Sequence, residues 1–120
     1  AGNVSGNYSA IGGLIGVNFG TTTTNGSNFG VISNSFVSGT TVGSIGIATS
    51  YSNNNVGGLV GLNRGVGKIM TSYVAAGTTV IGTNYIGGLA GSNAGSISNS
   101  YAAPVVTGAQ NLTGGLVGFG

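Results

Sequence analysis

One five-residue motif, Gly-Gly-Leu-small-Gly, occurs four times in this chain of 120 residues. Successive copies begin 45, 30 and 27 residues apart, so the regular unit is close to 28 residues and the first copy carries insertions. A fixed period of this length is typical of proteins that stack one small structural unit on the next. The four copies are residues 12–16 (GGLIG), 57–61 (GGLVG), 87–91 (GGLAG) and 114–118 (GGLVG).

Two further motifs recur after the glycine motif and predict short strands. The high content of glycine and β-branched residues disfavours helix, whereas the alternation in SISNSY is typical of a strand. The patterns therefore predict an all-β fold over a single domain, residues 1–120: a β-solenoid, similar to a parallel β-helix, of about four glycine-rich coils. The motifs are residues 31–36 (VISNSF), 68–73 (KIMTSY) and 96–101 (SISNSY), and GTTV at residues 39–42 and 77–80.

The apolar residues that recur at equivalent positions predict the core. We expect the leucine of each glycine motif to point inward, together with the isoleucine and the stacked aromatic ring of each six-residue motif. Because Asn99 shares the phase of Ile97 and Tyr101, the alternation also predicts an inward asparagine ladder, which Thr71 interrupts. The predicted core residues are Leu14, Leu59, Leu89, Leu116, Ile32, Ile69, Ile97, Phe36, Tyr73 and Tyr101.

Two insertions, near residues 19–30 and 43–55, are expected to form surface loops, as insertions in stacked repeats usually do. Asn25-Gly26 is a turn signal within the first, because both residues tolerate positive φ. Asn25 is also the best of four Asn-x-Ser/Thr sequences that permit glycosylation in a secreted protein. The others begin at Asn3, Asn7 and Asn111.

Composition argues against an enzyme. The chain has no Asp, Glu, His or Cys, which are the side chains that supply most acid–base catalysis and most metal ligands. We therefore expect no catalytic residue, no metal and no cofactor. The glycine-rich stretch around Arg64 and Lys68 is not a phosphate-binding loop, since Leu62 and Ile69 stand where that motif needs Gly and Ser or Thr. Arg64 and Lys68 are instead expected to be surface residues of a turn in the second repeat.

Charge and hydropathy limit the partners. A formal net charge of +2 is too small to indicate a nucleic-acid surface. No stretch approaches the roughly 18 apolar residues of a membrane span. We therefore expect neither nucleic acid nor a membrane span.

The repeat resembles the GLUG motif, whose family pattern reads approximately GGLVGxNxGxIxNSYaxGxVxG. Residues 87–108 (GGLAGSNAGSISNSYAAPVVTG) follow it closely, and residues 57–82 follow it with two extra residues and a departure at Met70-Thr71. The resemblance covers the chain apart from its insertions. It implies a β-solenoid of the kind found in large secreted surface proteins, including filamentous-haemagglutinin-like adhesins, and it carries no catalytic residues.

These observations lead us to expect an extracellular or cell-surface structural protein. The sequence begins and stops in mid-repeat, so we expect copies to stack head to tail into a filament. A repeat segment of a larger adhesin and a carbohydrate-binding module that contacts surface glycans are the alternatives. Ice binding is a weaker one, because the threonine pairs at residues 40–41 and 78–79 do not continue through all copies.

The composition also predicts resistance to acid. Acid denaturation normally follows from protonation of carboxylates that are paired in the native state, and this chain has no carboxylate or imidazole side chain. The β-type circular dichroism signal and the melting temperature should therefore agree between about pH 3 and about pH 7. Loss of the signal at the lower pH would contradict this prediction.

Overall fold

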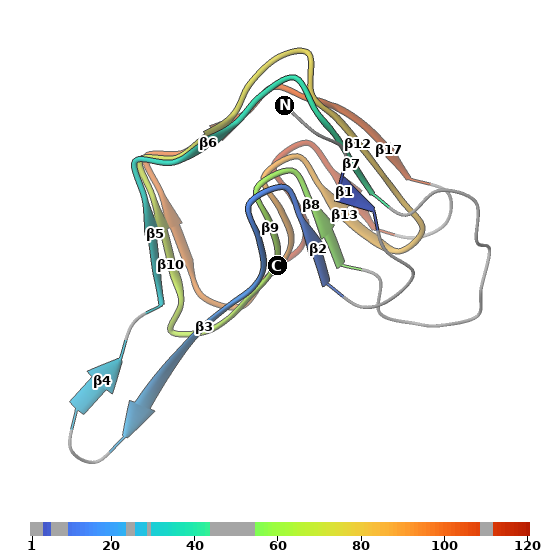
Figure 1. Cartoon of the computed structure of the whole chain (residues 1–120). Helices are drawn as coiled ribbons and strands as arrows, with labels where there is room; N and C mark the ends of the chain where they lie inside the picture. The colour runs from blue at the N-terminus through green and yellow to red at the C-terminus, as the bar shows by residue number, and fades with distance from the viewer. Residues whose placement is uncertain (1–3, 6–9, 24–25, 29, 44–54, 109–111) are drawn as a thin grey trace.

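The computed structural model describes residues 4–5, 10–23, 26–28, 30–43, 55–108 and 112–120 (Figure 1). Across these ranges the chain forms short strands and no helix, which confirms the all-β prediction. A helix long and apolar enough to cross a membrane is accordingly absent from the described ranges. The strands pair in parallel except for one antiparallel hairpin, an arrangement consistent with the β-helix-like class.

The strands of the described ranges form five sheets, and we name each after a residue or motif that recurs in it. The valine sheet contains β1 (Val4–Ser5), β7 (Thr41–Gly43), β12 (Thr79–Gly82) and β17 (Val105–Gly108). The GGL sheet contains β2 (Ala10–Gly12), β8 (Asn55–Gly57), β13 (Tyr85–Gly87) and β18 (Thr113–Gly114). The asparagine sheet contains β3 (Ile15–Thr23), β9 (Val60–Gly65), β14 (Ala90–Asn93) and β19 (Val117–Phe119), with β4 (Gly26–Asn28) beside β3. The isoleucine sheet contains β5 (Val31–Ser33), β10 (Lys68–Met70) and β15 (Ser96–Ser98), and the aromatic sheet contains β6 (Phe36–Val37), β11 (Tyr73–Val74) and β16 (Tyr101–Ala102). In Figure 1 the isoleucine, aromatic and valine sheets form an outer arc, and the GGL and asparagine sheets lie inside it.

The register places equivalent positions of the repeats next to one another. Each pair of neighbouring strands in the GGL sheet aligns the first glycine of one motif with that of the next. Between the strands, the leucine N–H of one motif donates to the leucine carbonyl of the following motif, at 2.8–3.0 Å. The aligned columns include Gly12, Gly57, Gly87 and Gly114; Val4, Val42, Val80 and Val106; and Ile32, Ile69 and Ile97.

The buried apolar residues of the described ranges form two clusters. The larger cluster joins the asparagine sheet to the isoleucine and aromatic sheets and contains Leu59, Leu89 and Ile69, all fully buried. The smaller cluster joins the GGL sheet to the valine sheet. Ile32 is buried in the larger cluster, and Ile97 packs against it while only partly buried. The smaller cluster contains Ile11, Val42, Val56, Val80 and Ile86.

Leu14 and Leu116 occupy the same motif position as the buried leucines but are 50% and 40% exposed. Each adjoins a strand that is last in its sheet, so no further strand from the described residues covers it. The prediction that all four motif leucines lie in the core is therefore wrong for Leu14 and Leu116. Position in the stack, as well as position in the repeat, decides burial.

The first predicted insertion is largely a hairpin. β3 continues past the body of the asparagine sheet, and Thr21, Thr22 and Thr23 pair antiparallel with β4. Figure 1 shows this hairpin projecting away from the other strands. Residues 24–25, which include the predicted turn residue Asn25, and most of the second insertion, residues 44–54, lie outside the described residues.

Candidate functional site

A ladder of side-chain amides crosses the asparagine sheet. Asn18 Nδ2 donates to Asn63 Oδ1 at 2.8 Å, and Asn63 Nδ2 donates to Asn93 Oδ1 at 2.7 Å. Each amide also donates to the carbonyl of the glycine directly before a strand of the isoleucine sheet, over 2.8–3.1 Å. Asn63 is fully buried, so these bonds form away from water, where an unpaired amide would be costly. The ladder therefore ties three repeats together in one register.

The asparagine ladder predicted at Asn99 is wrong, because that residue lies at a corner. Asn34, Thr71 and Asn99 have φ angles of 49°, 49° and 47°, and they separate the isoleucine sheet from the aromatic sheet. Left-handed backbone breaks the alternation of faces that an extended strand would keep. All three residues are exposed. Asparagine is among the non-glycine residues that adopt this conformation most readily, which explains its place here.

Replacement of Asn63 by alanine is expected to lower the free energy of unfolding by about 2–4 kcal/mol. The change removes both ladder bonds and the bond to the Gly67 carbonyl, and it leaves buried partners unpaired. Asn93→Ala is the matched control, because Asn93 is half-buried and its side chain has one ladder bond. Denaturant unfolding of both variants measures the difference, and equal losses would contradict a role for the buried ladder.

The three predicted core aromatics form a stacked column, but on the outside. Phe36 and Tyr73 have ring centroids 5.2 Å apart with planes at 8°, and Tyr73 and Tyr101 are 5.0 Å apart at 6°. Phe36 and Tyr101 are 57% and 58% exposed, so their predicted interior position is wrong. The corner at Asn99 turns the aromatic outward. Because the rings cover each other's faces, only their edges and the two outermost faces are open, which is a poor platform for a sugar.

The two ends of the stack expose most of the large apolar side chains that face solvent. Among the described residues, every exposed large hydrophobic except Met70, Val17 and Phe19 lies on, or close to, a strand that is last in its sheet. Val17 and Phe19 lie on β3, beyond which β4 pairs with residues 21–23. At one end these are Leu14, Val17, Phe19, Val31 and Phe36, and at the other Tyr101, Val105, Leu112, Leu116 and Phe119. Arg64 and Lys68, the only charged side chains in the sequence, lie on β9 and β10, which are paired on both sides. The end faces thus combine apolar surface with open strand edges, and neither charged side chain comes from a strand at the end of its sheet.

The second glycine of each motif marks where one repeat touches the next. A Cβ added at Gly13, Gly58 or Gly88 would collide with the carbonyl oxygen of the equivalent glycine in the following repeat. A Cβ at Gly115 would meet nothing within 4 Å. The space beside Gly115 is therefore the place that the carbonyl of a further repeat would occupy.

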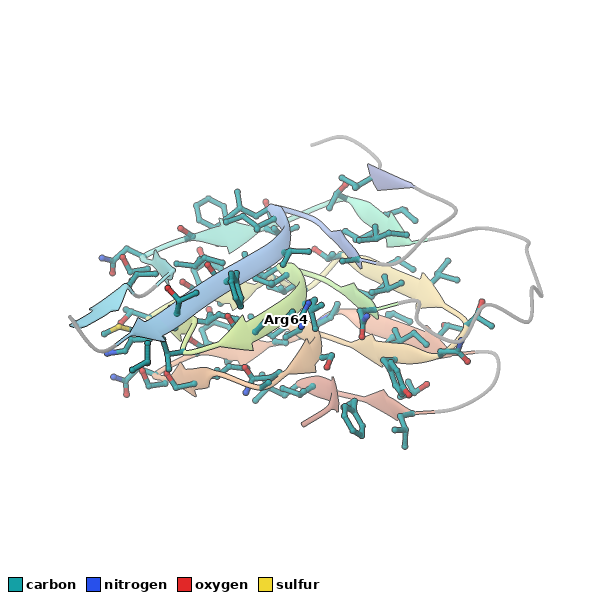
Figure 2. The ribbon with its side chains drawn as sticks, turned by 90° about the horizontal axis from the view of Figure 1, so that it is seen from below. Arg64 is labelled. Carbon is teal, nitrogen blue, oxygen red and sulfur yellow. The ribbon has the colours of Figure 1, made fainter. Side chains whose placement is uncertain are left out.

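Arg64 and Lys68 lie on strands β9 and β10, on either side of the turn at residues 66–67, rather than on the turn itself as predicted. The Arg64 guanidinium carbon lies 5.8 Å from the centroid of the Phe19 ring, a cation–π contact. Arg64 also lines a groove of about 530 Å³ between the GGL and asparagine sheets, together with Val17, Leu62, Tyr85, Ser92 and Phe119. In Figure 2 Arg64 lies near the middle of the stack. The sequence did not indicate this groove, because the residues that line it come from different repeats and differ in type even where their positions are equivalent.

The four predicted glycosylation sites lie outside the described residues: Asn3, Asn7, Asn25 and Asn111. Comparison of the chain with protein families, with curated proteins and with solved structures finds no match in any of the three.

Proposed function

We propose that this chain is a non-catalytic, extracellular structural protein: a β-solenoid of about four coils, with repeats of the GLUG type, that stacks end to end into a filament. The observation that carries the proposal is the character of the two end faces. Exposed apolar patches of this kind usually mark interaction sites, and open strand edges without charge are templates for pairing. Both features occur together at both ends of the same stack.

The strand count of the sheets supports a particular joint. The valine, GGL and asparagine sheets each contain four parallel strands, so a second copy can extend all three at once. In that arrangement β1, β2 and β3 of one copy pair with β17, β18 and β19 of the other. β4 does not obstruct the joint, because it pairs only with Thr21–Thr23 in the projecting hairpin. Each copy then advances the filament by four strand spacings, about 19 Å.

The side chains at this joint match the pairs found inside the molecule. Val106 would meet Val4 of the next copy and extend the valine column. Val117 would meet Ile15, as Val60 already does within the chain. The contact joins two different surfaces, so it does not close on itself and generates a fibre rather than a dimer.

Substitution of Gly115 by valine tests the joint directly. The new side chain has open space within one molecule, so we expect a wild-type circular dichroism spectrum. In the filament it would take the place of a backbone carbonyl, so assembly should be lost. Electron microscopy and sedimentation measure assembly, with Ala76→Val as the matched control, because Ala76 is exposed in the turn between β11 and β12, away from both end faces. Filaments of the Gly115 variant indistinguishable from wild type would refute the proposed joint.

A repeat segment of a larger cell-surface adhesin is the second candidate, and the two smaller sheets favour it. The isoleucine and aromatic sheets contain three strands each, so stacking of separate copies leaves one strand position open in both. A continuous chain of further repeats would fill those positions. A reconstruction of the assembled fibre distinguishes the candidates, because only stacked copies show a strand-wide gap beside β15 and β16.

A further inference from the structure

The groove beside Arg64 has a floor made of side chains rather than of open backbone. β8, β9, β13 and β14, which form its middle, each pair with a strand on both sides. A peptide therefore finds no free strand edge there on which to form main-chain hydrogen bonds. The groove instead offers an aromatic pair, a guanidinium and the hydroxyl-bearing Ser92.

The aromatic pair in the groove differs from the stacked column on the aromatic sheet. The rings of Tyr85 and Phe119 are 5.1 Å apart, and their planes are tilted by 34°. The rings of the column, by contrast, lie within 8° of parallel. Phe119 is about half exposed and Tyr85 is partly buried. An apolar ring face that enters the groove can pack on this pair.

Arg64 supplies a positive charge in the groove, apart from the aromatic pair. Its guanidinium is exposed and packs over Phe19, which restricts the orientation of its planar fork of donors. The sequence contains no Asp or Glu, so no side chain of this protein can offer it a carboxylate. Guanidinium and carboxylate groups match in a bidentate geometry, which makes a carboxylate the complementary ligand group.

We infer that the groove binds an acidic oligosaccharide, with a sugar ring packed on Tyr85 and Phe119 and a carboxylate paired with Arg64. β9 and β19 are two strands apart in the asparagine sheet, about 10 Å, so the ligand must extend past a single ring. A sugar chain presents apolar ring faces and polar edges together, which the mixed lining of the groove accommodates. Phe119 also lies on β19, one of the strands of the joint proposed above, whereas Arg64 lies on β9, which takes no part in that joint.

Isothermal titration with an oligogalacturonate tests the inference. Arg64→Gln should weaken binding by about 10- to 100-fold, the effect of a lost charge-assisted hydrogen bond. Lys68→Gln removes the same charge but does not line the groove, so its affinity should equal that of wild type. The methyl-esterified oligosaccharide, which lacks the carboxylates, should bind as weakly to wild type as the acidic form binds to the Arg64 variant.

Four outcomes would overturn the inference. They are no binding of oligogalacturonate to wild type, equal affinity of wild type and Arg64→Gln, equal losses in the Arg64 and Lys68 variants, and tighter binding of an oligoglutamate peptide than of the sugar. The third would indicate attraction to net charge alone. The last would assign the groove to an acidic peptide.

Discussion

Leu89→Ala is expected to lower the free energy of unfolding by about 2–5 kcal/mol, the usual range for a buried leucine. Leu89 is fully buried in the larger apolar cluster, between the asparagine sheet and the isoleucine and aromatic sheets. The truncation removes apolar contacts and leaves a cavity that the paired backbone on both sides cannot readily close. Chemical denaturation monitored by circular dichroism measures the loss.

Leu14→Ala is the matched control for this prediction. It makes the same chemical change at the same motif position, but Leu14 is 50% exposed, so the expected loss is about 1 kcal/mol or less. A loss at Leu14 as large as that at Leu89 would show that burial is not what distinguishes the two positions.

Gly88→Ala is expected to lower the free energy of unfolding by about 3 kcal/mol or more, at the upper end of what overpacking costs. Its Cβ would collide with the Gly115 carbonyl oxygen, a backbone atom that cannot rotate away. The GGL strands on either side would have to separate, and with them the leucine N–H bonds between motifs, such as that from Leu89 to the Leu116 carbonyl. The melting temperature of this variant is therefore expected to fall well below that of wild type.

Gly115→Ala isolates the cause of that effect. It is the same substitution at the same motif position in the following repeat, where nothing lies within 4 Å of the added Cβ. The melting temperature of the single molecule should be nearly unchanged. If both alanine variants lost equal stability, intrinsic backbone preference rather than close packing would account for the glycines.

The register of the sheets could be predicted from the sequence, because it depends on the repeat. Backbone pairing requires equivalent positions to meet, and the glycine motif permits a close approach only where another glycine motif lies opposite. The parallel all-β class followed from the same repeat. For the same reason, Ile32, Ile69 and Ile97 lie at equivalent positions on neighbouring strands.

The orientation of individual side chains was harder to predict from the sequence. The alternation in SISNSY predicts a continuous strand, but the left-handed backbone at Asn99 turns the chain and sends Tyr101 outward. The buried ladder lies instead at Asn18, Asn63 and Asn93, the asparagines that follow the glycine motif. Their recurrence two residues after the motif was the signal that could have indicated them.

The groove could not be predicted from the repeat at all. Val17, Leu62, Ser92 and Phe119 occupy one position of the asparagine sheet, yet they differ in size and polarity, so periodicity gives them no common role. The groove arises only when the sheets bring these residues beside Tyr85. The single arginine of the sequence was the one feature that could have drawn attention to it.

Cryo-electron microscopy of the concentrated protein tests end-to-end stacking most directly. End-to-end stacking predicts unbranched filaments whose strands lie across the fibre axis, with a strand spacing of about 4.8 Å and a subunit rise of about 19 Å. It also predicts continuous density from β17, β18 and β19 of one copy into β1, β2 and β3 of the next. A protein that stays monomeric at every concentration, or that forms only closed dimers, would contradict it.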